Sequence, residues 1–133
     1  MTPKELMAEA ERARASSYSP YSRFSVGAAI AGKSGRVYHG CNVENASFGL
    51  ACCAERTAVF KAVSEGEKVF TAIAVTAGPG RGAPPCGACR QVLYEFSPLM
   101  WVHWRDTRGR IVRRRLRALL ADAFDFGKHG GKR

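Results

Sequence analysis

The chain has 133 residues, of which 46% are hydrophobic and 24% charged, a composition that fits one globular domain and excludes a disordered protein. Its longest unbroken apolar runs, Val26–Gly32 and Phe48–Ala54, have seven residues each, whereas a membrane-spanning helix needs about 18 or more. The net charge of +10 is concentrated in residues 105–133, which hold 10 Lys and Arg against 3 Asp and Glu, so this segment either meets a polyanion or is a solvated strand and tail.

The first half of the chain is predicted to hold a helix, a hairpin and a second helix. Thr2-Pro3-Lys4-Glu5 reads as a capping box with proline at the first helical position. Glycine and polar turn residues separate the next two apolar segments, which is typical of a β-hairpin. In chain order the elements are a helix from Pro3 to about Ser16, strands Phe24–Ala31 and Arg36–Cys41, and a helix over Cys53–Val63.

The second half alternates strands and helices. The elements are a strand Val69–Thr76, a helix Cys86–Phe96, strands Met100–Trp104 and Arg110–Arg115, and a helix Leu116–Phe124. This alternation predicts an α/β domain with a mixed sheet, antiparallel in the hairpin and parallel between strands that are joined through a helix. We expect one domain over residues 1–126 and a frayed basic tail over 127–133.

Cysteines at the starts of two predicted helices are candidate metal ligands. Cys86 and Cys89 lie three residues apart, so their sulfurs can point toward one ion, and Cys53 supplies a third thiolate. Three protein ligands leave a tetrahedral Zn²⁺ one open position, which is the pattern of a catalytic site. The alternatives are a redox pair or a structural zinc site in which Cys41 or Cys52 is the fourth ligand.

Two charged residues follow Cys53 directly. The carboxylate of Glu55 can take a proton from a water on the metal, and Arg56 can donate hydrogen bonds to a thiolate. The positive ends of the two helix dipoles also offset the charge of the sulfurs. An odd number of cysteines, five, and a charged chain start favour the reducing cytoplasm as the location.

Five motifs in order match one enzyme family. Cys-Ala-Glu at 53–55 followed by Pro-Cys-x-x-Cys at 85–89 is the signature of zinc nucleoside deaminases. The other matching segments are Tyr18–Ser22, Phe24–Ala28 and Gly40–Ser47. The sequence resembles the cytidine deaminases of the small, homotetrameric zinc type. That resemblance implies a three-layer α/β/α sandwich with a mixed five-stranded sheet, one Zn²⁺ per chain, and a homotetramer with shared active sites.

The resemblance implies the hydrolytic deamination of cytidine and 2′-deoxycytidine to uridine and 2′-deoxyuridine, with release of ammonia, as part of pyrimidine salvage. In this family a zinc-bound hydroxide attacks C4, and the residue that matches Glu55 moves the protons. Asn42 and Glu44 are expected to hold the ribose 3′-hydroxyl. Phe24 is expected to stack near the pyrimidine, and the backbone of Ala54 to read the cytosine edge. Neighbouring subunits are expected to contribute Ala46, Phe48 and Phe124.

Other functions compete with this one. A deaminase for a nucleoside antibiotic or another aminated base is disfavoured by the sugar motif of Asn42 and Glu44, and a non-catalytic metal-stabilised protein leaves Glu55 without a role. We expect no nucleic-acid partner, because Trp101 and Trp104 fall on opposite faces of a strand and form no common stacking platform. Simple core packing is the alternative explanation for the aromatic positions at 24 and 124.

Overall fold

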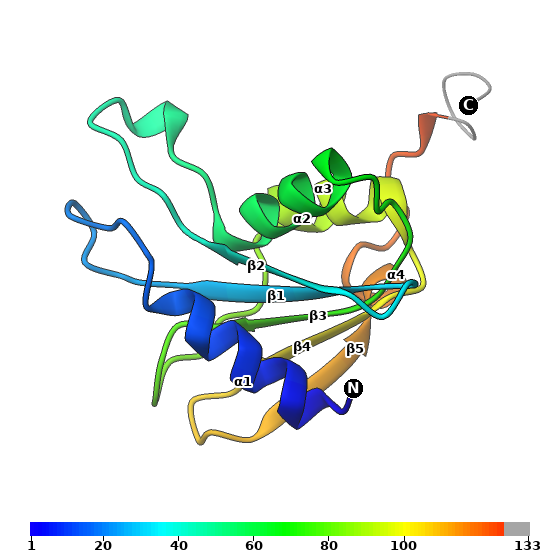
Figure 1. Ribbon diagram of the computed structural model, residues 1–133, viewed down its shortest axis with the longest axis horizontal. Helices are drawn as coiled ribbons and strands as arrows, with labels where there is room; N and C mark the ends of the chain where they lie inside the picture. Colours follow the sequence, from blue (N-terminus) through cyan, green and yellow to red (C-terminus); the bar gives the residue numbers. More distant parts are fainter. Residues whose placement is uncertain (127–133) are drawn as a thin grey trace.

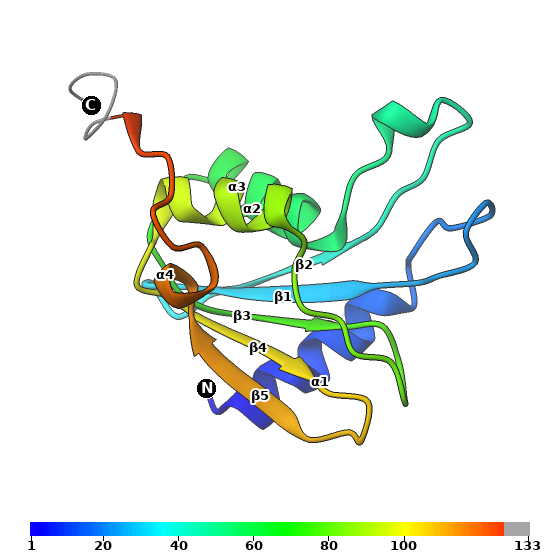
Figure 2. The same cartoon turned by 180° about the vertical axis from the view of Figure 1, so that it is seen from behind.

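A single mixed sheet with the strand order β2-β1-β3-β4-β5 organises the computed structural model, which describes residues 1–126. The strands are β1 (Gly27–Gly32), β2 (Val37–Cys41), β3 (Phe70–Thr76), β4 (Trp101–Arg105) and β5 (Ile111–Arg115). The helices are α1 (Pro3–Arg14), α2 (Ala54–Ser64), α3 (Gly87–Phe96) and the short α4 (Leu116–Leu119). Helix α1 covers one face of the sheet, and α2 and α3 cover the other (Figures 1 and 2). The predicted three-layer α/β/α sandwich is confirmed.

The helix starts follow from local sequence. Thr2 Oγ1 accepts from the backbone N–H of Glu5 at 3.1 Å, and the Glu5 carboxylate accepts from the Thr2 N–H at 3.2 Å, so the predicted capping box is present. Cys53 and Cys86 are the N-cap residues of α2 and α3, so each of these helices begins one residue later than predicted. Helix α1 ends at Arg14, two residues earlier than the sequence indicated.

The order of the strands corrects one prediction. β3 and β4 are joined through α3 and pair in parallel, as expected, but β1 and β3 pair antiparallel. The crossover through α2 does connect two strands that run in the same direction, β2 and β3. Because β1 lies between them, it is antiparallel to both neighbours. Periodicity along the chain predicts strands, but it does not say which strand is inserted between two others.

Two glycines let helices approach the sheet closely. A Cβ atom on Gly40 of β2 would lie 2.4 Å from the backbone nitrogen of Ala58, so only glycine allows α2 to pack at this distance. A Cβ atom on Gly27 of β1 would lie 2.1 Å from the carbonyl oxygen of Ala10 in α1. The contact at Gly40 sets the height of the α2 N-terminus above the sheet, and with it the position of Cys53.

Each face of the sheet carries its own apolar core. On the α1 side, Ala29 and Ala74 pack against Leu6, Met7 and Ala10. The larger cluster on the α2 and α3 side is formed by fully buried aliphatic side chains, among them Ile30, Val59, Ile73, Val75 and Leu93. Burial of each large aliphatic side chain contributes about 1.5–3 kcal/mol, so α2 and α3 are fixed on the sheet by packing.

The C-terminal segment differs from the prediction. The expected helix Leu116–Phe124 stops after one turn at Leu119, and Asp122 adopts a positive φ of 51°, a conformation that a helix excludes. The chain then returns toward α3, where Gln91 Nε2 donates to the carbonyl oxygen of Phe124 at 3.0 Å. The tail predicted over 127–133 lies outside the described residues. Within residues 1–126, no helix is both long and apolar enough to cross a membrane.

Candidate active site

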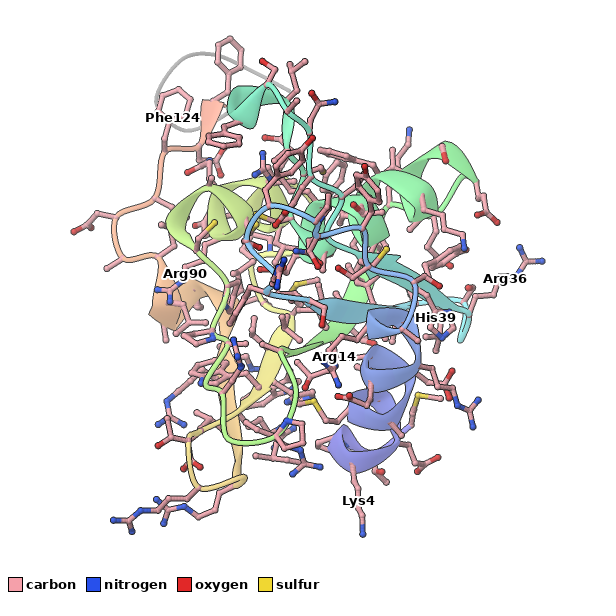
Figure 3. All side chains as sticks on the ribbon, turned by 90° about the vertical axis from the view of Figure 1, so that its left-hand side faces the viewer. Lys4, Arg14, Arg36, His39, Arg90 and Phe124 are labelled. Atoms are coloured by element: carbon pink, nitrogen blue, oxygen red, sulfur yellow. The ribbon has the colours of Figure 1, made fainter. Side chains whose placement is uncertain are left out.

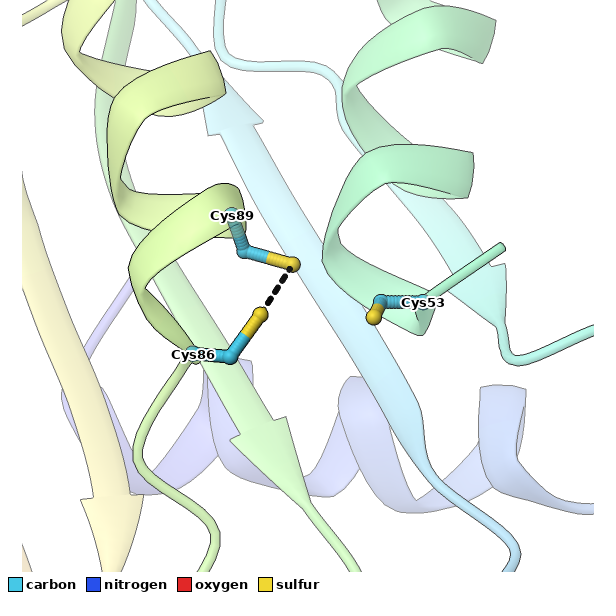
Figure 4. Close-up of side chains that lie close together, drawn as sticks. All are labelled: Cys53, Cys86 and Cys89. Atoms are coloured by element: carbon cyan, nitrogen blue, oxygen red, sulfur yellow. Dashed lines mark hydrogen bonds between the residues drawn. The ribbon is translucent and has the colours of Figure 1, made fainter. Parts of the chain in front are cut away.

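Three thiol groups converge where the N-termini of α2 and α3 meet. The Sγ atoms of Cys53, Cys86 and Cys89 all lie within 4.8 Å of one another, and those of Cys86 and Cys89 are 3.5 Å apart (Figure 4). Cys53 and Cys86 precede their helices as caps, and Cys89 points inward from the first turn of α3. The two sequence segments that were predicted to form a metal site therefore come together in the fold.

The donor set fits a small, thiophilic divalent cation. Thiolates bound tetrahedrally to one Zn²⁺ at about 2.3 Å stand about 3.8 Å apart, which agrees with the spacing of this cluster. Cys89 is buried, Cys53 is half-buried and Cys86 is exposed, so one side of the cluster stays accessible. Among the described residues, neither Cys41 nor Cys52 belongs to the cluster.

The electrostatics of the cluster also favour a cation. A hydrogen bond from Cys89, together with Arg56, lowers the pKa of Cys53 to about 5. The same hydrogen bond and burial raise the pKa of Cys89, so this thiol resists ionisation unless positive charge is added. Arg56 Nη2 donates to the Cys53 sulfur at 3.3 Å, while its buried Nε has no hydrogen-bond partner among the described residues.

Glu55 lies beside the thiols at the start of α2. Its side chain is only 6% exposed, and burial raises its pKa above the usual carboxyl range. Glu55 and Cys53 line the same cavity, so a molecule bound there meets the sulfur cluster and a carboxyl group that holds and releases protons at moderate pH.

The cavity has the size and lining of a small-molecule site. Its volume is about 520 Å³, within the range of 300–1,000 Å³ that is common for ligand pockets. Val75 of β3 and Val26, directly before β1, form an apolar floor, and Phe24 forms part of the wall. The other lining residues are Ser22, Asn42, Glu44, Cys53, Ala54, Glu55, Gly82, Ala83, Pro84 and Cys86.

The two polar residues predicted to bind a sugar, Asn42 and Glu44, also make hydrogen bonds to the backbone around the mouth of the cavity. Asn42 accepts from the Val26 N–H at 2.9 Å and donates to the Phe24 carbonyl oxygen at 2.8 Å. The Glu44 carboxylate accepts from the backbone N–H groups of Tyr21 and Ser22 at 3.0 and 3.1 Å and from the Ser22 hydroxyl, and these hydrogen bonds lower its pKa. Glu44 therefore stays ionised at the cavity mouth.

Three residues that were predicted to contact the substrate do not line this cavity. Ala46 is exposed, and Phe48 is 76% exposed at the tip of a protruding loop, where its ring contacts Tyr21 edge to face. Phe124 is 59% exposed at the periphery of the molecule (Figure 3). Its exposure rules out core packing as the explanation for this residue.

Three further residues, to which no motif assigned a role, make contacts near the site. The guanidinium of Arg81 lies 5.1 Å from the centroid of the Phe24 ring. Arg90 donates to the carbonyl oxygens of Pro85 and Leu119, both at 2.8 Å, and Gln91 holds the carbonyl of Phe124. Arg90 and Gln91 directly follow Cys89, and this position next to a predicted metal ligand was the sequence signal that could have identified them. The glycine-rich loop that contains Arg81 carries no such signal.

Comparisons with known proteins agree on one family. Residues 1–103 match the family model described as the cytidine and deoxycytidylate deaminase zinc-binding region. A cytidine deaminase from Halalkalibacterium halodurans is 50% identical over 125 residues, covering 93% of this chain and 95% of the relative, and one from Sporosarcina psychrophila is 46% identical with similar coverage. The crystal structure of cytidine deaminase from Burkholderia pseudomallei superposes with a TM-score of 0.88 at 46% identity, covering 93% of this chain and all of that one.

Proposed function

Because this chain belongs to the cytidine and deoxycytidylate deaminase family, we propose that it is a cytidine deaminase that hydrolyses cytidine and 2′-deoxycytidine to the corresponding uridines and ammonia. The observation that carries this proposal is the convergence of Cys53, Cys86 and Cys89 beside the buried Glu55 in one nucleoside-sized cavity. The reaction would serve pyrimidine salvage, and thiol ligands suit the reducing cytoplasm. We assign residues 1–126 to one deaminase domain.

One Zn²⁺ per chain fits the three thiols. Cys53, Cys86 and Cys89 would hold it, and the accessible side of the cluster would leave a position for solvent. When bound, the metal supplies Lewis-acid activation of a water molecule. Arg56, at 3.3 Å from the Cys53 sulfur, offsets the excess negative charge of three thiolates on one divalent ion.

Glu55 moves the protons of the reaction. Its carboxylate accepts a proton from the attacking water and delivers it to the ring nitrogen N3 of cytosine. The second proton goes to the 4-amino group, which leaves as ammonia when the C4–N bond breaks. The raised pKa of this buried carboxyl suits a group that must both accept and donate a proton near neutral pH.

The cavity wall selects a free nucleoside. Phe24 and the apolar floor accept the flat pyrimidine, and the backbone at Ala54 faces the same space for contacts with the cytosine edge. Asn42 keeps hydrogen-bonding capacity beyond its backbone contacts for the ribose 3′-hydroxyl, and Glu44 has free lone pairs for it. The negative charge of Glu44 repels a phosphate at the same position.

Neighbouring copies would complete the site in a homotetramer. Large apolar side chains are exposed on the protruding loop and on the C-terminal segment. They are Phe48, Leu50, Phe124 and Phe126. Exposed apolar clusters of this kind mark association surfaces. We assign Ala46 and Phe48 to the closure of one neighbour's cavity and Phe124 to another's.

The decisive test is Glu55→Gln, with Glu65→Gln at the exposed end of α2 as the matched control. We expect Glu55→Gln to keep one zinc per chain and lower kcat on cytidine by about 10²–10⁴-fold, the usual contribution of a positioned acid and base. Glu65→Gln should change neither quantity. Loss of the ultraviolet band of cytidine measures turnover, and elemental analysis measures zinc. A Glu55→Gln enzyme with full activity, or a wild type that releases no ammonia from either nucleoside, contradicts the proposal.

A further inference from the structure

The sheet face on the α1 side is only partly covered by a helix. α1 packs through Leu6, Met7 and Ala10 against Ala29 and Ala74, which belong to β1 and β3. β4 and β5 continue the sheet beyond this contact, and β5 is the last strand of the described sheet (Figure 2). On this side β5 and the two ends of β4 are therefore open to another molecule, whereas His103 in the middle of β4 is buried.

The strand register decides which side chains occupy that open face. His103 pairs with Ala74 and so points to the α1 side, and Trp101 shares this side because it lies two residues away. Arg113 and Arg115 pair with His103 and Trp101 across β4 and β5. The arginine face, as we name it, consists of Trp101, Arg105, Arg113 and Arg115.

The guanidinium groups of two arginines of this face lie over the indole ring. The guanidinium carbons of Arg113 and Arg115 are 3.7 and 3.9 Å from the centroid of Trp101, so close that they must occupy opposite faces of the ring. Neither makes an ion pair with a carboxylate of residues 1–126, whereas Arg110 pairs with Asp106 at 3.0 Å. Cation–π contacts thus orient both guanidiniums while their positive charge stays available to an anion.

Hollows extend the arginine face toward α1. One of about 440 Å³ lies between Arg105 and the helix and includes Lys4, and another of about 540 Å³ includes Arg105 and Arg108. The one acidic side chain that lines them, Glu11, is engaged by Arg14 Nε at 2.7 Å. The hollows therefore continue the positive surface past the end of β4.

We propose that the arginine face and these two hollows form a docking surface for single-stranded nucleic acid. Cationic groups bind the phosphates, and the outer plane of a guanidinium is a surface on which an unpaired base stacks. The bases of a duplex are already stacked on one another and offer no free face to a guanidinium, so a single strand fits this surface better. This revises the expectation drawn from Trp101 and Trp104, because Trp101 with its two arginines forms a platform without a second tryptophan.

The docking surface is separate from the catalytic cavity. Ala54 and Glu55 of α2 line the cavity, so it lies on the α2 and α3 side of the sheet. The protruding loop and the C-terminal segment, which carry the exposed aromatic residues assigned to subunit contacts, also lie on that side (Figure 1). The strand register places the arginine face on the α1 side. Association of subunits through the exposed aromatic residues leaves the arginine face free. A strand bound here is not the substrate, and the proposal stands or falls independently of the deaminase activity.

The experiment measures binding of fluorescein-labelled oligo(U), about 16 nucleotides long, to the full chain by anisotropy between about 50 and 200 mM salt. Each phosphate contact on a single strand contributes about 0.7 to the slope of log K against log salt. We expect Arg113→Gln/Arg115→Gln to reduce that slope by about 1.4 and weaken binding about tenfold. Arg113→Lys/Arg115→Lys should keep the slope and lose about fivefold in affinity, since the stacking planes are gone.

Matched controls separate the surface from net charge. Arg114→Gln/Arg117→Gln removes two neighbouring charges that are not part of the arginine face, and we expect wild-type binding. Cytidine turnover should be unchanged in every variant, which shows that each one is folded. Equal losses in the control and in Arg113→Gln/Arg115→Gln, or equal competition by heparin at the same charge concentration, would overturn the proposal. So would wild-type binding by Arg113→Gln/Arg115→Gln.

Discussion

The sulfur cluster and the aromatic rim, our name for the exposed Phe48 and Phe124 outside the cavity of their own chain, are built in opposite ways. The cluster comes from two helix starts that one chain packs on one sheet, and its most buried ligand, Cys89, is fully enclosed. The rim residues Phe48 and Phe124 stand on a protruding loop and on a segment without regular structure, and both are mostly exposed. From this difference we infer that one chain contains the groups needed for the proposed reaction, and that neighbouring copies close the cavity.

The largest expected effect removes the cluster itself. Cys89→Ala deletes one of three sulfurs, and the remaining pair cannot hold Zn²⁺ in the same geometry. Because metal binding and folding are linked, we expect loss of zinc, loss of several kcal/mol in the free energy of unfolding, and turnover of cytidine reduced by orders of magnitude. Elemental analysis, thermal unfolding and the cytidine assay measure these three quantities.

Cys41→Ala is the control for Cys89→Ala. Cys41 ends β2, is only partly buried and lies outside the sulfur cluster, so its loss should leave zinc content and activity unchanged. Zinc retained at one per chain in Cys89→Ala would show that the cluster is not the metal site, and the contrast between cluster and rim would lose its basis.

The sequence was informative about the cluster because its signals are local. The spacing of Cys86 and Cys89 and the capping positions of Cys53 and Cys86 depend on a few neighbouring residues, and the fold reproduces them. The strand insertion of β1 between β2 and β3 depends on long-range packing, so periodicity did not reveal it. The early end of α4 at Leu119 likewise has no glycine or proline to signal it.

The rim provides the second prediction. Phe124→Ala removes a large apolar side chain that we assign to the cavity of another subunit. Aromatic residues at the centre of an interface typically contribute 2 kcal/mol or more, so we expect kcat/KM to fall about 30-fold and the tetramer to dissociate at higher protein concentration, with zinc content unchanged. Sedimentation velocity and the cytidine assay measure the two effects.

Leu99→Ala is the matched change away from the rim. Leu99 is 57% exposed, nearly as much as Phe124. It lies in the loop between α3 and β4, after the C-terminus of α3, whereas the cysteines lie at the N-terminus of that helix. We expect neither association nor kcat/KM to change. A Phe124→Ala enzyme that keeps both its oligomeric state and its activity would mean that the rim belongs to no shared site.

The smallest predicted effect concerns the connection between cluster and rim. Gln91 lies in α3, two residues after Cys89, and its side chain donates to the Phe124 carbonyl oxygen at 3.0 Å. This hydrogen bond ties the C-terminal segment to α3. A single neutral hydrogen bond contributes about 1 kcal/mol, and Gln91→Leu should therefore lower kcat/KM about fivefold without loss of zinc. If this bond acts only by placing the Phe124 ring, adding Gln91→Leu to Phe124→Ala should cost nothing more, because the ring that it positions is already absent. Fully additive losses would instead mean that Gln91 acts on the cluster directly, and that cluster and rim are not coupled through the C-terminal segment.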